Sequence, residues 1–401
     1  MKNEQNAPKI RFKGFTDAWE LRELGDIVGI YDGVHQTPNY QNSGIMFLSV
    51  ENIATLKSSK FISEEDFKRD YKVYPQENDI LMTRIGDVGT TNVVTDNGLK
   101  AYYVSLALLK YKGTDPYFLS NAIQSDYVQK GLANRTLKTA IPMKINKDEI
   151  GKVSVMLPLS ATEQQQIGTY FRTLDHLITL HQRKCETLQK LKKSMLQKMF
   201  PKNGSCFPEI RFAGFTDAWE LRELGDIVGI YDGVHQTPNY QNSGIMFLSV
   251  ENIATLKSSK FISEEDFKRD YKVYPQENDI LMTRIGDVGT TNVVTDNGLK
   301  AYYVSLALLK YKGTDPYFLS NAIQSDYVQK GLANRTLKTA IPMKINKDEI
   351  GKVSVMLPLS ATEQQQIGTY FRTLDHLITL HQRKLETLKK LKKAMLQKMF
   401  I

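Results

Sequence analysis

The strongest constraint on this chain is that it contains nearly the same long sequence twice. Residues 10–200 and 210–400 align without a gap at an offset of 200. The segment from Gly14 to Lys184 is repeated without a change from Gly214 to Lys384. A solenoid is excluded, because its units are about 20–50 residues long. The chain is therefore a tandem duplication of a whole folding unit. The four differences are Lys13/Ala213, Cys185/Leu385, Gln189/Lys389 and Ser194/Ala394.

The composition is that of a globular protein, and its charge favours a polyanionic partner. Of 401 residues, 41% are apolar and 24% are charged, which is enough apolar material for packed cores. The formal net charge is +9. This charge favours nucleic acid as the partner, with an acidic membrane surface as the second choice. The alternative is that a charge of +9 is ordinary for a chain of this length.

The features of export and membrane insertion are not found, which predicts a cytoplasmic protein. Cys185 and Cys206 have neither the spacing of a metal site nor that of a disulfide framework. The first ten residues lack the apolar core of a signal peptide. No stretch approaches the roughly 18 uncharged apolar residues that a membrane-spanning helix needs.

The first part of each repeat has the pattern of a mixed α/β domain. A helix is expected to begin at Asp115, which caps it, with Pro116 in the first turn and apolar residues at helical spacing as far as Leu132. Strand-like runs, rich in Val, Ile, Leu, Tyr and Phe and bounded by Gly, Asn and Pro, occur at 44–50, 78–85, 101–112 and 152–158.

The last 40 or so residues of each repeat predict one long helix. Ser160 and Glu163 form a capping box, and Pro201 and Gly204 are expected to end the helix. Apolar residues recur every three or four positions, which is typical of a coiled-coil seam. The predicted seam residues are Ile167, Phe171, Leu174, Ile178 and Leu188, with Ile367, Phe371, Leu374, Ile378 and Leu388 in the second copy.

These patterns predict an α+β protein in which two globular domains alternate with two long helices. An antiparallel coiled coil of the helices buries both seams and relates the two heads by a pseudo-two-fold axis. The predicted segments are a first domain at 1–159, a spacer helix at 160–200, a linker at 201–208, a second domain at 209–359 and a distal helix at 360–401.

No motif of a catalytic or metal site was identified. Residues 84–91, RIGDVGTT, contain glycines but lack the lysine of a phosphate-binding loop. Neither a G-x-S-x-G elbow nor an H-E-x-x-H helix occurs. Three histidines per repeat, without nearby Cys or paired carboxylates, predict no metal site. The chain is therefore expected to act by binding.

Three polar loops in each repeat have the residue types that contact DNA. They lie at 31–42, 83–92 and 134–144. Asn and Gln can pair with adenine, Arg with guanine, and Lys and Thr with phosphates. The alternative is that these residues simply build solvated turns. The predicted DNA-binding residues are Tyr31, His35, Gln36, Asn39, Arg84, Thr90, Thr91, Asn92, Arg135, Lys138 and Lys144, with Tyr231, His235, Gln236, Asn239, Arg284, Thr290, Thr291, Asn292, Arg335, Lys338 and Lys344.

Several stretches resemble the specificity subunits of type I restriction-modification systems. They are IRFKGFTDAWELRELGDI, YDGVHQTPNY followed by GIMFLSVENI, ENDILMTRIGDVGTTNVV, and the helix that is entered through EQQ and left through LQKMF. The resemblance covers essentially the whole chain. It implies two target-recognition domains for double-stranded DNA, separated by helices that fix the gap between two half-sites.

The resemblance also implies partners. Two methyltransferase subunits would bring S-adenosylmethionine, and two restriction subunits, where present, would use ATP and Mg. This chain itself is expected to bind no cofactor and to catalyse nothing alone.

The duplication departs from the family pattern of two different recognition domains. Two identical heads related by a two-fold axis predict an interrupted palindrome as the target. Two alternatives from other classes remain: a stand-alone bivalent DNA-binding protein, and a coiled-coil scaffold that binds only protein.

Overall fold

The computed structural model describes residues 7–202 and 205–401. The chain divides into two compact units, each built from both halves of the sequence. Unit one is Met1–Gln182 with Arg383–Ile401, and unit two is Arg183–Gln382. The first residues of the first predicted domain, 1–6, and Asn203 and Gly204 of the predicted linker lie outside the described residues.

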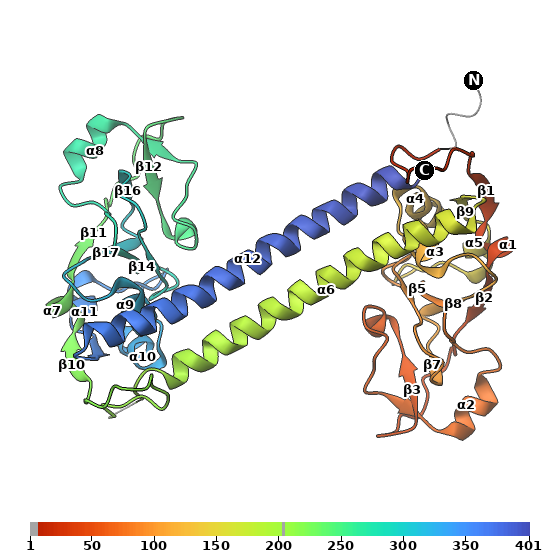
Figure 1. Cartoon of the computed structure of the whole chain (residues 1–401), viewed down its shortest axis with the longest axis horizontal. Coiled ribbons are helices and arrows are strands. Elements are labelled where there is room, and N and C mark those ends of the chain that lie inside the picture. Colours follow the sequence, from red (N-terminus) through yellow and green to blue (C-terminus); the bar gives the residue numbers. More distant parts are fainter. Residues whose placement is uncertain (1–6, 203–204) are drawn as a thin grey trace. The chain divides into compact units, whose positions relative to one another are not determined.

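The two repeats have the same elements in the same order (Figure 1). In the first repeat the strands are β1 (Glu20–Glu23), β2 (Gly29–Asp32), β3 (Ile45–Leu48), β4 (Phe61–Ile62), β5 (Ile80–Thr83), β6 (Thr91–Val93), β7 (Lys100–Tyr102), β8 (Leu106–Lys110) and β9 (Ser154–Leu157). The helices are α1 (Leu24–Ile27), the 3-10 turn η2 (Val50–Asn52), α2 (Glu64–Asp70), α3 (Pro116–Ile123), α4 (Asp126–Arg135), α5 (Lys147–Gly151) and α6 (Ala161–Lys198).

The second repeat follows the same plan. Its strands are β10 (Glu220–Glu223), β11 (Gly229–Asp232), β12 (Ile245–Leu248), β13 (Phe261–Ile262), β14 (Ile280–Thr283), β15 (Thr291–Val293), β16 (Lys300–Tyr302), β17 (Leu306–Lys310) and β18 (Ser354–Leu357). Its helices are α7 (Leu224–Ile227), η3 (Val250–Asn252), α8 (Glu264–Asp270), α9 (Pro316–Ile323), α10 (Asp326–Arg335), α11 (Lys347–Gly351) and α12 (Ala361–Met399).

Two elements differ from the sequence-based expectation. The run at 101–112 is not one strand but β7 and β8, because the chain turns at Tyr103, whose amide bonds to Leu48 and whose carbonyl accepts from Leu106. The helix expected from Asp115 to Leu132 is α3 and α4. It breaks at Gln124 in both repeats. In the first repeat the Ser125 hydroxyl caps the new helix by accepting from the amide of Val128, whereas α10 begins at the same position without this bond. The cap predicted at Asp115 is present, at 2.8 Å from the Phe118 amide.

Each head contains two larger sheets and a short one. The first has the order β2-β8-β5-β6 and is antiparallel throughout, with Ile80 opposite Leu109. The second has the order β4-β3-β7, in which β3 and β7 pair in parallel, with Phe47 opposite Ala101. Strands β1 and β9 form a separate antiparallel pair. A core lies on each larger sheet, and α3, α4 and α6 contribute to the first of these cores.

The long helices run antiparallel within each unit. In unit one the start of α6 shares a core with the end of the chain, which contributes Leu388, Met399 and Phe400. Lys392 Nζ lies 2.7 Å from the Asp175 carboxylate. The ring of Phe400 lies 5.6 Å from that of Phe171. Higher residue numbers at the end of the chain thus lie opposite lower residue numbers in α6. The two helical segments therefore run in opposite directions.

Unit two has the same packing, but here the end of α6 packs against the start of α12. Leu188, Met199 and Phe200 enter the core of the second head, and Lys192 Nζ lies 2.7 Å from Asp375. Each head is thus completed by the far end of the helix that belongs to the other repeat. Among the described residues, none of the helices combines the length and apolar character needed to cross a membrane.

Candidate nucleic-acid interface

The three predicted DNA-facing loops are joined at their bases by Arg84. The guanidinium of Arg84 pairs with the carboxylate of Asp32 at the end of β2. Its Nε donates to the carbonyl of Ile145 at 3.0 Å, just beyond the third loop. The Arg84 side chain is only 6% exposed. In unit two Arg284 makes the same bonds. We name this cluster of Arg84, Asp32 and Ile145 the arginine joint.

The second loop is a tight turn between β5 and β6. Gly89 has a φ of +98°, and a Cβ there would lie 2.5 Å from the side chain of Gln129, so only glycine fits without a shift. The Thr90 amide donates to the Thr83 hydroxyl at 3.0 Å. The Thr90 hydroxyl in turn donates to Asp87 at 2.6 Å. The turn is therefore held by its own hydrogen bonds.

Two of the predicted residues in this loop point into the head. The Thr91 hydroxyl, which is buried, bonds to the carbonyl of Ser120 at 3.0 Å and so ties β6 to α3. The Asn92 amide donates to the carbonyl of Ile53 at 2.8 Å. Both side chains fix the base of the loop against neighbouring elements.

The first loop lines a hollow against α2, which we name the polar hollow. His35, Gln36 and Asn39 form one wall, and their copies form the same wall in unit two. The volume is about 640 Å³ in unit one and 520 Å³ in unit two. The opposite wall consists of Asp66, Arg69, Asp70 and Tyr71.

The α2 wall of the polar hollow is itself ordered by charge. Arg69 contacts both Asp66, at 2.7 Å, and Asp70, at 2.8 Å. The hydrogen bond from Ser63, and then the one from Arg69, lowers the pKa of the Asp66 carboxyl below its usual value. Burial raises the pKa of Tyr71, whose hydroxyl donates to the carbonyl of Tyr102 at 2.8 Å. The hollow therefore offers both donors and acceptors.

The residues of this α2 wall were not among those predicted from the sequence. A signal was present, because Ser63 followed by Asp66 has the spacing of a helix N-terminus. The Ser63 hydroxyl does accept from the Asp66 amide, at 3.0 Å. The local pattern could not show that α2 packs opposite His35, because the two are far apart in the sequence.

The third loop is exposed and carries most of its charge outward. Its residues Arg135 to Lys144 are named the basic loop below. The Arg135 guanidinium lies 3.0 Å from Glu149. In the part of the chain that the structure describes, neither Lys138 nor Lys144 has an ion pair, and both are exposed. Tyr31, on β2, is 40% exposed.

The structure thus separates most of the predicted DNA-binding residues into two groups. Those with internal partners are Arg84, Thr91 and Asn92, with Arg284, Thr291 and Asn292. Those that are exposed are Tyr31, His35, Gln36, Asn39, Arg135, Lys138 and Lys144, with the same positions in unit two except Arg335, which is half-buried and pairs with Glu349. Thr90 and Thr290 are half-buried and bonded to Asp87 and Asp287. A base contact through the buried Arg84 would require the arginine joint to open.

The predicted seam residues lie in the two cores that include helix ends. Ile167, Phe171, Leu174 and Leu388 are buried in unit one, and Ile178 packs against them. Ile367, Phe371, Leu374 and Leu188 are buried in unit two, with Ile378 beside them.

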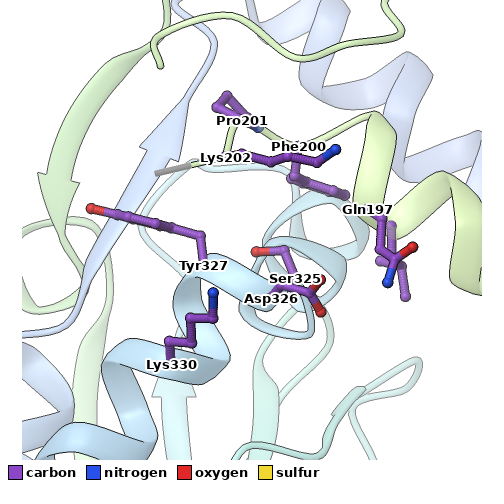
Figure 2. Close-up of a pocket in the computed structure, with 9 residues that line it drawn as sticks. Gln197, Phe200, Pro201, Lys202, Ser325, Asp326, Tyr327 and Lys330 are labelled. Atoms are coloured by element: carbon purple, nitrogen blue, oxygen red, sulfur yellow. The ribbon is translucent and has the colours of Figure 1, made fainter. Parts of the chain in front are cut away.

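A further hollow lies in unit two, where α6 ends beside α10 (Figure 2). Figure 2 shows Phe200, Pro201 and Lys202 on one side of it. Asp326 and Lys330 lie on the other side. Its volume is about 210 Å³, and none of the predicted DNA-binding residues lines it. Within the described ranges, no group of three His, Cys, Asp or Glu side chains is arranged to hold a metal ion.

Comparison with known proteins adds one family, one relative and one solved structure. The sequence pattern of the type I restriction modification DNA specificity domain matches residues 16–190 and again residues 216–390. The chain is 22% identical over 411 residues to the type I restriction enzyme MjaVIII specificity subunit of Methanocaldococcus jannaschii, covering 98% of this chain and 94% of that protein.

A solved structure shares the fold. The crystal structure of a type I restriction-modification system S subunit from M. genitalium superimposes with a TM-score of 0.71 at 15% identity. The match covers 98% of this chain and 99% of that one. Two matches to the same domain, each coinciding with one repeat, account for most of the sequence.

Proposed function

We propose that this chain, which belongs to the type I restriction modification DNA specificity family, uses its two copies of the domain to read the two halves of a split DNA target. The observation that carries the proposal is the identity of Gly14–Lys184 with Gly214–Lys384. Identical sequences place the same three loops on the same arginine joint in both heads. Equal surfaces select equal half-sites.

The expected target is therefore an interrupted palindrome. Opposite strands of a duplex run in opposite directions, so two equal heads related by a two-fold axis meet the same bases on opposite strands. The long helices would set the gap between the half-sites.

The exposed residues are the proposed DNA contacts. Gln36 and Asn39 can each pair with adenine edges, and Lys138 and Lys144 can contact phosphates. The net charge of +9 supports a polyanionic partner. Arg84, Thr91 and Asn92 would act indirectly, by holding the loops in place.

The catalytic steps would belong to partner subunits. We propose that the chain recruits two methyltransferase subunits with S-adenosylmethionine and, where they exist, two restriction subunits that use ATP and Mg. The lack of a nucleotide-binding, hydrolase or metalloprotease motif in the sequence supports this division. The proposed location is the cytoplasm.

Methylome sequencing tests this function directly. Cells would express the chain with its methyltransferase partner, with two controls: the partner alone, and the partner with another specificity chain. Adenine methylation at one interrupted palindrome is the expected result. An asymmetric motif would keep the recognition function and overturn the symmetry argument. No methylation by a partner that is active with the other chain would contradict the function itself.

A further inference from the structure

The tip of the basic loop carries an isoleucine that nothing covers. Ile141 is 100% exposed in unit one, and Ile341 is 98% exposed in unit two. Leu137 and Met143 beside it are 45% and 46% exposed. Single exposed apolar side chains are common on protein surfaces, so the surroundings of Ile141 decide whether it has a function.

The base of this loop is fixed on both sides. The amide of Leu137 donates to the carbonyl of Lys144 at 2.8 Å, which closes the loop on itself. The amide of Gly86 donates to the carbonyl of Met143 at 2.8 Å, which ties the loop to the turn after β5. The exposed tip is thus presented from a bonded frame rather than from a free tail.

The basic loop itself carries charge of one sign, and the nearest acidic partner in the ion pairs is Glu149, which pairs with Arg135 at the start of the loop. Residues 127–147 contain no Asp or Glu. They contain five basic residues: Lys130, Arg135, Lys138, Lys144 and Lys147. Lysines spaced on both sides of an apolar tip fit the phosphates that border a DNA groove. A hydrophobic protein surface would not require this charge, so the surroundings favour DNA as the occupant.

We propose that Ile141 and Ile341 enter the DNA target as apolar wedges, one in each half-site, while Lys138 and Lys144 and their copies contact the flanking phosphates. This inference rests on the proposed function. Apolar side chains of this kind can insert between base steps, partly unstack them and kink the duplex. The cost of unstacking depends on the step, so a wedge would also contribute to sequence selection.

The test uses the full chain with its methyltransferase partner on the duplex site found by methylome sequencing. The variant is Ile141→Ala with Ile341→Ala, and 2-aminopurine in the half-site reports unstacking. We expect specific affinity to fall at least about tenfold, because each apolar contact to the bases is lost at both half-sites. The 2-aminopurine signal should fall with it, while non-specific affinity stays unchanged.

A second variant separates the charge from the wedge. Lys138→Ala with Lys338→Ala should weaken specific and non-specific binding alike and reduce the dependence of binding on salt. A matched control is Leu21→Ala with Leu221→Ala. These leucines are 55% and 58% exposed and lie in β1 and β10, each between a glutamate and an arginine and outside the three predicted DNA-facing loops, so binding should not change.

Three results would overturn the wedge. The first is that Ile141→Ala with Ile341→Ala keeps the wild-type affinity and the wild-type 2-aminopurine signal. The second is a loss of affinity that deoxyuridine in place of thymidine reproduces without unstacking, which would mean contact with a thymine methyl. The third is reduced assembly with the methyltransferase, measured by mass photometry. Failure of the proposed function is distinct, because the wild-type chain itself would then prefer no site.

Discussion

Arg84 belongs to a residue type that often recognises bases, but here it holds together the bases of the loops that carry other polar residues. Arginine is the most frequent reader of guanine, and on sequence Arg84 stands in a polar loop. In the structure it is buried and bonded to Asp32 and Ile145. The local sequence gave no sign of this, because its two partners are 52 and 61 residues away.

Replacing Arg84 should therefore affect stability first. Arg84→Ala with Arg284→Ala leaves Asp32 and the Ile145 carbonyl without their donor, so we expect the free energy of unfolding to fall by about 2–3 kcal/mol per head. Urea denaturation measures this. Arg135→Ala with Arg335→Ala is the control, because that ion pair is partly solvated and should change stability by less than about 1 kcal/mol. If Arg84→Ala with Arg284→Ala left stability unchanged but abolished specific binding, Arg84 would be a base-contacting residue after all.

At the scale of elements, the start of α6 is docked onto the head through a glycine. A Cβ on Gly168 would lie 2.2 Å from Asp115 Oδ1 and 2.9 Å from the Phe118 amide nitrogen. Asp115 caps α3, and burial raises the pKa of its carboxyl. The helix therefore passes directly over the N-terminus of α3, and only the absence of a side chain allows that approach.

Gly168→Ala with Gly368→Ala tests this docking. Alanine normally favours a helix over glycine by about 1 kcal/mol, but here the added methyl must displace the capping carboxylate and backbone. We expect the free energy of unfolding to fall by about 1–3 kcal/mol, measured by thermal and urea denaturation. Thr173→Ala with Thr373→Ala, on the exposed face of the helices, should be neutral or slightly stabilising. A higher free energy of unfolding for Gly168→Ala with Gly368→Ala would mean that α6 is not held this close to Asp115 and α3.

The elements themselves were predictable to different degrees. The capping residues Ser160 and Asp115 and the spacing of apolar residues predicted the starts of α6 and α3, because those signals are local. The break at Gln124 and the turn at Tyr103 were missed. Both occur within continuous apolar patterns, and each depends on hydrogen bonds that a periodicity does not reveal. The parallel pairing of β3 with β7 is non-local and left no trace in the sequence.

At the scale of the whole molecule, each head needs a helix end from the other repeat. In unit one these residues are Leu388, Met399 and Phe400, and the first repeat has Leu188, Met199 and Phe200 at the same positions. A fragment of residues 1–200 therefore contains everything that one head and its partner helix end require. The tandem repeat predicted this redundancy, although the extent of the exchange is visible only in the cores.

The fragment 1–200 should therefore form a homodimer. Each copy would supply Phe200 to the core of the other, as Phe400 does between Trp19 and Phe171 in the intact chain. Sedimentation equilibrium should give twice the fragment mass. The same fragment with Leu174→Asp, which places a charge in that core, should lose the dimer and much of its stability. A fragment that is monomeric and as stable as the full chain would contradict this account.

The hydrogen bond that closes each head has a consequence for how the chain can be connected. The amide of Ile10 donates to Lys398 in unit one, and that of Ile210 donates to Lys198 in unit two, both at 2.9 Å. In unit two the two partners are also joined by the linker, whereas in unit one they belong to opposite ends of the polypeptide. The same hydrogen bond therefore forms whether or not a linker joins its two partners. A circular permutant that opens at the linker and joins the original ends would have nearly the same sequence and the same two cores.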